Sequence, residues 1–169
     1  MRPLLDEIET AIPPLRRYAR ALLRDADLAD DLVQDCLERT LDRLPTLRAE
    51  GSIRAWMFRI LLNLARDGRR RRAQLHFLPL SEAPQLAASG GQEDHLELER
   101  VHAAMGRLPD DQRAALLLVA LEGMSLAKAA EVLDIPVGTL VSRLARARAA
   151  LREMTGRPRK QPLLREVIK

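Results

Sequence analysis

The sequence LEGMSLAKAAEVLDIPVGTLVSRLARARAALR, residues 121–152, has the pattern of two helices joined by a tight turn. The first helix is predicted to begin at Ser125, and its apolar positions are Leu126, Ala129, Ala130 and Leu133. Asp134, Ile135 and Pro136 form the connection, in which proline is already set for the first turn of the next helix. The second helix is predicted to run to about Arg152. This order of elements is typical of a helix-turn-helix.

The second of these helices has two distinct faces at 100° per residue. The apolar face consists of Leu140, Leu144, Ala147 and Leu151. The opposite face consists of Gly138, Thr139, Ser142, Ala145 and Arg146. Small residues let a helix lie deep in a major groove, while hydroxyl and guanidinium groups can bond phosphates or base edges. We therefore predict that this helix contacts duplex DNA through Thr139, Ser142, Arg143 and Arg146.

The same periodicity would also suit an amphipathic helix pair whose arginines only solvate the surface. However, Arg143, Arg146, Arg148 and Arg152 crowd this helix, and no acid follows until Glu153. A merely solvated helix usually mixes both signs of charge. DNA binding is therefore the favoured interpretation.

Charge is distributed unevenly along the 169 residues, although the formal net charge is only +4. Residues 51–73 and much of 98–169 are basic, while residues 74–97 contain acids but neither lysine nor arginine. Two basic blocks separated by an acidic segment suggest two contacts with a polyanion. A chain of this length can hold two small domains. We predict an all-α protein with helical domains at 1–73 and 96–155, a flexible linker at 74–95 and a basic tail at 156–169.

Several kinds of chemistry lack the residues they need. The sequence has no glycine-rich phosphate loop, nucleophile elbow or metal-binding Cys/His spacing, so we predict no enzyme activity, cofactor or metal site. The single cysteine, Cys36, excludes an internal disulfide and is expected to be buried. No apolar segment approaches the roughly 18 residues needed to span a bilayer. We therefore expect a cytoplasmic protein with no membrane insertion.

The N-terminal part predicts two helices. Residues 1–24 are expected to be helical, with an interruption or a fresh start at Pro13 and Pro14. A second helix is predicted over residues 28–44, and its outer face is acidic. These outer residues are Asp30, Asp31, Gln34, Asp35, Glu38 and Asp42. Acids are favourable near a helix N-terminus in any protein, but this cluster is denser than that effect requires and could dock a basic partner.

A third helix is predicted from Ile53 to about Asp67 and is mostly apolar. A polar stripe of Arg59, Asn63, Arg66 and Arg70 crosses it at spacings i, i+4, i+7 and i+11. Gly68 is followed by four consecutive arginines, residues 69–72. A helix end favours cations, but about two would satisfy that effect. Together with Trp56 and Asn63, this cluster suggests a nucleic-acid surface.

Two further helices precede the helix-turn-helix. Helix is expected to resume near Asp94 and to stop at Pro109. The next helix opens with Asp110 and Asp111, acids that suit a helix N-terminus, and ends before Gly123. We expect these two helices to support the helix-turn-helix.

Three separate blocks resemble, in order and spacing, the small two-domain sigma factors of the extracytoplasmic-function group, group 4 of the sigma-70 family. The blocks are DLVQDCLERTL at residues 31–41, IRAWMFRILLNLARDGRRRR at 53–72 and GMSLAKAAEVLDIPVGTLVSRLARARAAL at 123–151. The segment LPDDQRAALLLVALEGMS at 108–125 also resembles the start of their second domain. The resemblance implies a sigma region 2 helical bundle followed by a sigma region 4 helix-turn-helix.

The resemblance also implies a function. Such a factor binds the RNA polymerase core through its beta and beta-prime subunits, directs it to promoters and helps to open the duplex. The implied core-binding residues are Asp31, Gln34, Asp35 and Glu38.

The third helix would read the minus-10 element as single strand, with Asn63 contacting a base and the loop at 47–55 holding an extruded base. The implied minus-10 contacts are Trp56, Arg59, Asn63, Arg66, Arg69, Arg70, Arg71 and Arg72. The helix at 136–152 would lie in the major groove of the minus-35 element, and an anti-sigma factor is an implied partner.

The chain departs from the family pattern at three positions. Many relatives carry arginine where this chain has Val141 and a bulky aromatic residue where it has Ala145, so direct recognition of minus-35 is expected to differ. Lys128 replaces the acid that would complete a capping box with Ser125.

The segments PPLRRYARAL and DLVQDCLERTL resemble the general-stress-response branch of the family.

Two alternatives come from other classes of protein. A sigma-like module could bind an anti-sigma factor by mimicry and never contact DNA, but such mimics are usually joined to a receiver domain that this chain does not show. The basic cluster and Asn63 also argue against that alternative. A single-domain helix-turn-helix repressor would leave residues 1–73 unexplained.

Overall fold

The computed structural model describes residues 2–44, 52–75 and 92–156. These residues form seven helices and no strand, which confirms the predicted all-α class. The chain divides into two compact units, Met1–Pro84 and Gln85–Lys169. The predicted linker and basic tail fall largely outside the described residues.

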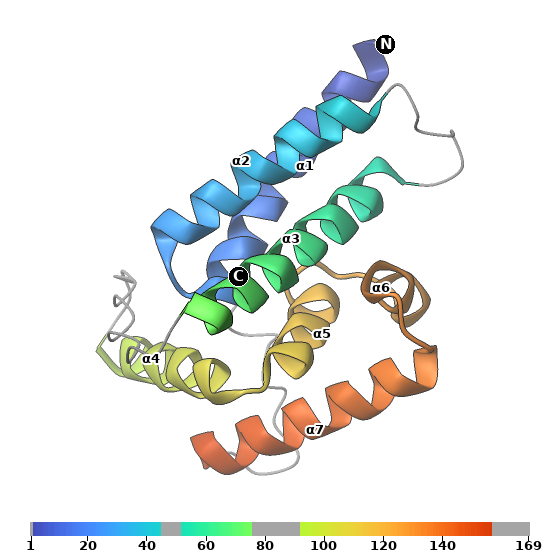
Figure 1. Ribbon diagram of the computed structural model, residues 1–169. Helices are drawn as coiled ribbons and strands as arrows, with labels where there is room; N and C mark the ends of the chain where they lie inside the picture. Colours follow the sequence, from blue (N-terminus) through green and yellow to red (C-terminus); the bar gives the residue numbers. More distant parts are fainter. Residues whose placement is uncertain (1, 45–51, 76–91, 157–169) are drawn as a thin grey trace. The chain divides into compact units, whose positions relative to one another are not determined.

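The first unit contains α1 (Arg2–Leu23), α2 (Ala26–Arg43) and α3 (Ile53–Leu75). Each of these helices contacts the other two (Figure 1). At the centre, the rings of Tyr18 and Phe58 meet edge to face with centroids 5.2 Å apart, and both side chains are fully buried. Such aromatic pairs add stability beyond the apolar area that they bury. The core of this unit therefore joins α1 to α3, while α2 covers the side of both.

α1 is a single helix, so the predicted interruption at Pro13 and Pro14 is wrong. Prolines at these positions remove the amide hydrogens that would bond the carbonyls of Glu9 and Thr10. Glu9 and Thr10 are exposed, so water can bond those carbonyls instead. The buried residues continue at helical spacing on both sides of the prolines, at Ile8, Ala11, Leu15, Tyr18, Ala19 and Leu22. Packing of one continuous apolar face offsets the cost of the two prolines.

α3 continues beyond its predicted end near Asp67 and reaches Leu75. Gly68 therefore lies inside the helix, and a Cβ atom built there would meet only the Arg72 guanidinium, at 3.7 Å. The four consecutive arginines are helical as well. Because successive residues point about 100° apart on a helix, these arginines surround α3 rather than forming one cluster on one side.

The second unit contains α4 (Gln92–Arg107), α5 (Asp110–Ala120), α6 (Leu126–Leu133) and α7 (Val137–Thr155). α7 contacts the other three helices, and α5 also contacts α6 (Figure 1). The largest fully buried side chains of this unit are Leu116, Leu118, Leu133, Leu140, Leu144 and Leu151. The apolar face predicted for α7 is therefore the face that packs on its neighbours.

The helix-turn-helix has the predicted start and turn. The Ser125 hydroxyl accepts a hydrogen bond from the backbone nitrogen of Lys128 at 3.2 Å, so half of a capping box is present. Asp134 adopts the left-handed conformation with φ of 56°, which ends α6, and Pro136 precedes the first residue of α7. α7 extends three residues further than predicted, to Thr155, where Gly156 ends it at φ of 67°.

Candidate nucleic-acid and polymerase interfaces

The acidic side chains in the middle of α2 are exposed and form no ion pairs with the described residues. Asp31, Gln34, Asp35 and Glu38, here called the α2 acidic face, are all exposed. Among the described residues, the only interaction of these four side chains is a hydrogen bond from Gln34 Nε2 to Glu38 Oε1 at 3.3 Å. The neighbouring Asp30 instead pairs with Arg20 at 3.1 Å and Arg16 at 3.5 Å on α1. The α2 acidic face therefore presents carboxylates that are not neutralised by the described residues.

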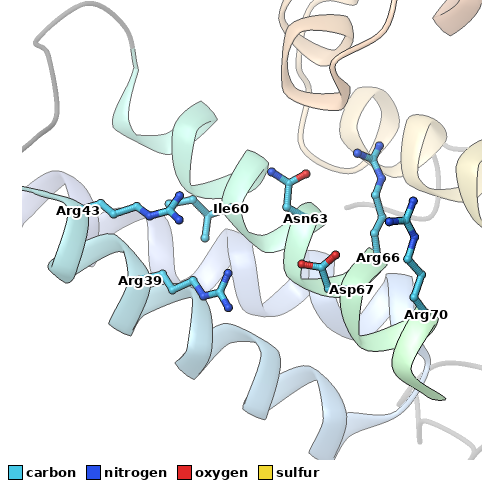
Figure 2. A pocket seen from close by; sticks show the side chains of 7 residues that line it. All are labelled: Arg39, Arg43, Ile60, Asn63, Arg66, Asp67 and Arg70. Carbon is cyan, nitrogen blue, oxygen red and sulfur yellow. The ribbon is translucent and has the colours of Figure 1, made fainter. Parts of the chain in front are cut away.

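A cavity of about 420 Å³ lies between α2 and α3 (Figure 2). Arg39 and Arg43 extend toward it from α2, as the close-up shows. α3 contributes the remaining lining residues, Ile60, Asn63, Arg66, Asp67 and Arg70. Four guanidinium groups against one carboxylate give this cavity a strongly positive character, which favours a phosphate-bearing ligand.

Asn63 is the exposed amide among these cations. Its side chain offers two donor hydrogens and one acceptor oxygen, which is the set that hydrogen bonding to a base edge requires. Asp67 lies one helical turn further along α3 and adds acceptor oxygens only. The cavity therefore combines cations suited to a phosphate with polar groups suited to a base.

Arg39 and Arg43 belong to this cavity although the sequence analysis did not single them out. Acidic residues dominate the sequence of α2, which therefore predicts only polymerase docking for that helix. The two arginines are spaced by four residues, which places them on one face of α2. That spacing is the signal that could have predicted a second binding surface, positively charged, at the C-terminal end of this helix.

The other predicted minus-10 residues are arranged around α3 in different ways. Arg59 is exposed one turn before Asn63, and Trp56 is half-buried. Of the four consecutive arginines, Arg70 lines the cavity and Arg69, Arg71 and Arg72 do not. Most of the predicted base-binding loop at residues 47–55 lies outside the described residues. Its described part includes Ile53 and Ala55, which are buried.

The outer face of α7 carries a chain of polar contacts. The Ser142 hydroxyl donates to the backbone carbonyl of Thr139 at 3.2 Å, and Arg146 Nη2 donates to the Ser142 hydroxyl oxygen at 3.0 Å. These contacts hold Arg146 along the outer surface of the helix. Arg143 differs, because its Nε lies 3.1 Å from Asp111 Oδ2 on α5 and its side chain is only 22% exposed. The ion pair fastens α7 to α5.

Cys36 is buried, as predicted. Its thiol donates to the backbone carbonyl of Met57 at 3.4 Å, which links α2 to α3. Burial raises the pKa of the Cys36 thiol to about 11, so the thiol stays protonated at neutral pH. The side chain therefore serves the core as a small apolar group. Within the described ranges, no helix is long and apolar enough to cross a membrane.

Two family models match the chain. The model of the Sigma2 domain of PhyR matches residues 8–62, and the model of Sigma-70, region 4 matches residues 98–151. The ECF RNA polymerase sigma factor EcfG of Rhodopseudomonas palustris is 44% identical over 149 residues, covering 88% of this chain and 82% of the relative. A similar sequence thus spans both units and the segment between them.

Solved structures show the same architecture. The sigma factor RpoE of Bartonella quintana, crystallised with the anti-sigma factor NepR, superposes with a TM-score of 0.78 and 28% identity, covering 94% of this chain and all of that chain. The anti-anti-sigma factor PhyR of Bartonella quintana, in complex with NepR, has a TM-score of 0.61 and 18% identity, and only 49% of it is covered. Its likeness to this chain concerns the fold alone. The chain belongs to the extracytoplasmic-function sigma factors of the sigma-70 family, which bind RNA polymerase and direct it to promoter DNA.

Proposed function

We propose that this sigma factor reads its promoters at two points, with the cavity between α2 and α3 holding the melted minus-10 strand and α7 lying in the minus-35 major groove. The observation that carries the first half is the cavity lined by Asn63 and by arginines from two helices. A base must leave its stack before such a cavity can receive it, at a cost of a few kcal/mol. Phosphate contacts from the arginines and hydrogen bonds from Asn63 can offset that cost.

The Asn63→Ala variant is expected to impair promoter opening more than duplex binding, because the amide contacts a base only after the strands separate. We expect opening to fall by about tenfold, the effect of losing one good base contact, while duplex binding changes less than twofold. Opening can be followed with 2-aminopurine placed in the minus-10 element of a promoter bound by the reconstituted holoenzyme. Duplex binding can be followed by fluorescence anisotropy of the same promoter under conditions that keep it closed. Equal losses in the two measurements would refute the single-strand role of Asn63.

The arginines around α3 are expected to differ in their contribution to DNA binding. Arg70 lines the cavity, whereas Arg72 lies about 160° away from Asn63–Arg70 on the helix, counted at 100° per residue from residue 70. Arg70→Ala should therefore reduce the slope of log affinity against log salt by about one unit, and Arg72→Ala should leave the slope unchanged. The two variants remove the same charge from positions two residues apart on one helix, so each is the control for the other. A titration with forked promoter DNA at several salt concentrations distinguishes them, and identical slopes would contradict the assignment.

We further propose that the α2 acidic face docks on the clamp helices of the large polymerase subunit. Its exposed carboxylates lack ion-pair partners among the described residues, so a basic surface can approach without first breaking internal pairs. Asp30 is not included, because Arg16 and Arg20 already neutralise it. We also propose that the protein works in the cytoplasm with RNA polymerase, as a specificity subunit that leaves the catalytic step to the core.

An anti-sigma factor is the proposed regulator. The similar sigma factor RpoE of Bartonella quintana was solved in complex with the anti-sigma factor NepR, which supports an equivalent partner for this chain. The 44% sequence identity between this chain and EcfG supports placing this chain in the general-stress-response branch. A sigma-like mimic that never contacts DNA is disfavoured, because this chain carries arginines both around the cavity and on α7.

A further inference from the structure

Two valines on α7 face outward from the helix-turn-helix. Val137 and Val141 are each 46% exposed. They are four residues apart, so their side chains are neighbours along one face of the helix. Exposed apolar residues are common when scattered singly on a protein surface. Their position on this particular helix is what calls for an explanation.

The surface around Val141 is shaped for close approach. Ala145 follows one turn later and is exposed, with a side chain of a single methyl group. Gly138 precedes Val141 by three residues, and a Cβ atom built on Gly138 would meet nothing within 4 Å. The two valines and these small residues make one flank of the outer face, here called the apolar flank. Thr139, Ser142 and Arg146 make the other, polar flank.

The positive charge on α7 favours DNA as the binding partner of the apolar flank. Arg148 and Arg152 follow Val141 at i+7 and i+11, which continues the same flank toward the end of the helix. An apolar protein or lipid surface would have to accommodate these cations, whereas the phosphates beside a major groove attract them. The side chains near the start of a recognition helix are those that reach base edges.

The major groove offers one apolar group, the C5-methyl group of thymine. Valine has no donor for the oxygen and nitrogen acceptors of guanine, and it would leave the amino group of cytosine without a partner. We propose that Val141, with Val137 beside it, contacts a thymine methyl group in the minus-35 element and so selects a T·A pair there. The proposal rests on α7 entering the major groove, as set out above.

Replacing thymine by deoxyuridine removes the methyl group and leaves the hydrogen-bonding edge of the base unchanged. The probe is a minus-35 duplex selected by the full-length holoenzyme from a randomised pool, with each thymine replaced in turn. At one or two positions, we expect deoxyuridine to weaken binding by about fourfold, the effect of leaving one methyl group in water. Val141→Ala should weaken binding to the thymine duplex to a similar extent. In addition, this variant should no longer respond to deoxyuridine at that position, because the two changes remove the same contact.

Met154→Ala is the matched control, since Met154 is also an exposed apolar residue of α7 but lies at its far end. This variant should keep the full response to deoxyuridine. Alanine is favourable in helices, so Val141→Ala is expected to fold. Equal deoxyuridine responses in the wild type and Val141→Ala would overturn the proposal. So would specific minus-35 binding that is insensitive to every methyl group, and in that case the major-groove role of α7 would survive. Failure to select any minus-35 sequence would overturn both.

Discussion

Replacing Arg113 by alanine is expected to lower the free energy of unfolding of residues 85–169 by about 2 to 4 kcal/mol, the range for losing several buried hydrogen bonds from one charged side chain. Arg113 is only 9% exposed. Its Nε donates to the carbonyl of Met105 at 2.9 Å, and its Nη2 donates to the carbonyls of Gly106 at 3.2 Å and Leu108 at 2.9 Å. Asp110 lies 3.2 Å from the same guanidinium group.

These three carbonyls lie at the end of α4, where helical residues run out of amide donors. The planar guanidinium group supplies several donors in a fixed arrangement, so one side chain satisfies the whole corner between α4 and α5. Alanine would leave the carbonyl of Leu108 buried without a donor, and the carbonyl of Met105 would keep only the longer bond from the backbone nitrogen of Leu108 at 3.3 Å. Unsatisfied buried groups are costly. Because α7 packs on both α4 and α5, loss of this corner should also abolish minus-35 binding.

The chain itself provides the means to measure this effect. Its only tryptophan, Trp56, lies on α3, so tryptophan fluorescence during urea unfolding reports on the first unit. Far-ultraviolet circular dichroism reports on all helices. Arg113→Ala should lose part of its helical signal at lower urea, while the fluorescence midpoint stays within error of the wild type. Arg107→Ala, which removes an exposed arginine from the end of α4, should change stability by less than about 0.5 kcal/mol. A loss below about 1 kcal/mol in Arg113→Ala would contradict the structural role assigned to it.

Reversing two charges on the α2 acidic face should lower the affinity for the polymerase core by about 100-fold or more. The double variant Asp31→Lys and Asp35→Lys replaces two favourable contacts by like-charge contacts, which cost several kcal/mol across an interface. Both side chains are exposed, so the fold should tolerate the change. Anisotropy of the labelled sigma factor titrated with purified core gives the affinity directly.

Net charge alone could also weaken binding, so the control must carry the same change elsewhere. Asp6→Lys with Glu7→Lys reverses two exposed acids on α1 and leaves the α2 acidic face intact. This control should bind the core within about threefold of the wild type, since distant surface charges act mainly through screened long-range attraction. Equal loss of affinity in the two double variants would show that the α2 acidic face is not the docking surface.

Much of the fold could be predicted from helical periodicity, and the reason is visible in the second unit. The buried side chains of α7 are Leu140, Leu144, Ala147 and Leu151, the four residues of its predicted apolar face. The turn before α7 was also predictable, because the Ser125 cap and Pro136 act through local backbone geometry. Local rules of this kind need no knowledge of the rest of the chain.

Other features depend on tertiary contacts that no local pattern contains. Pro13 and Pro14 suggest a break, but α1 stays continuous because its apolar face packs along the whole length. Arg113 looks like any helical arginine in the sequence, since the groups it binds are backbone carbonyls that are brought to it by the fold. Arg143 was predicted as a DNA contact from the run of arginines on its helix, and its ion pair with Asp111 on another helix could not be predicted, because it depends on how α5 and α7 pack.

The candidate site shows the same division. The polar stripe of α3 was predictable from spacing, and Asn63, Arg66 and Arg70 do line one cavity. The contribution of Arg39 and Arg43 was not predicted, because it requires α2 to lie beside α3. Two helices with separate sequence patterns thus build one positively charged cavity.

The central claim, that this chain programmes RNA polymerase through two promoter contacts, is tested most directly by run-off transcription with purified core and a library of genomic promoters. The wild type should produce promoter-specific transcripts that core alone does not produce. The Asn63→Ala variant should transcribe poorly from a paired promoter, because promoter opening is the step that it impairs. Its transcription should recover when the minus-10 element is already unpaired on a mismatched template. Absence of specific transcripts at every salt concentration tested, with a sigma factor that binds the core, would contradict the account.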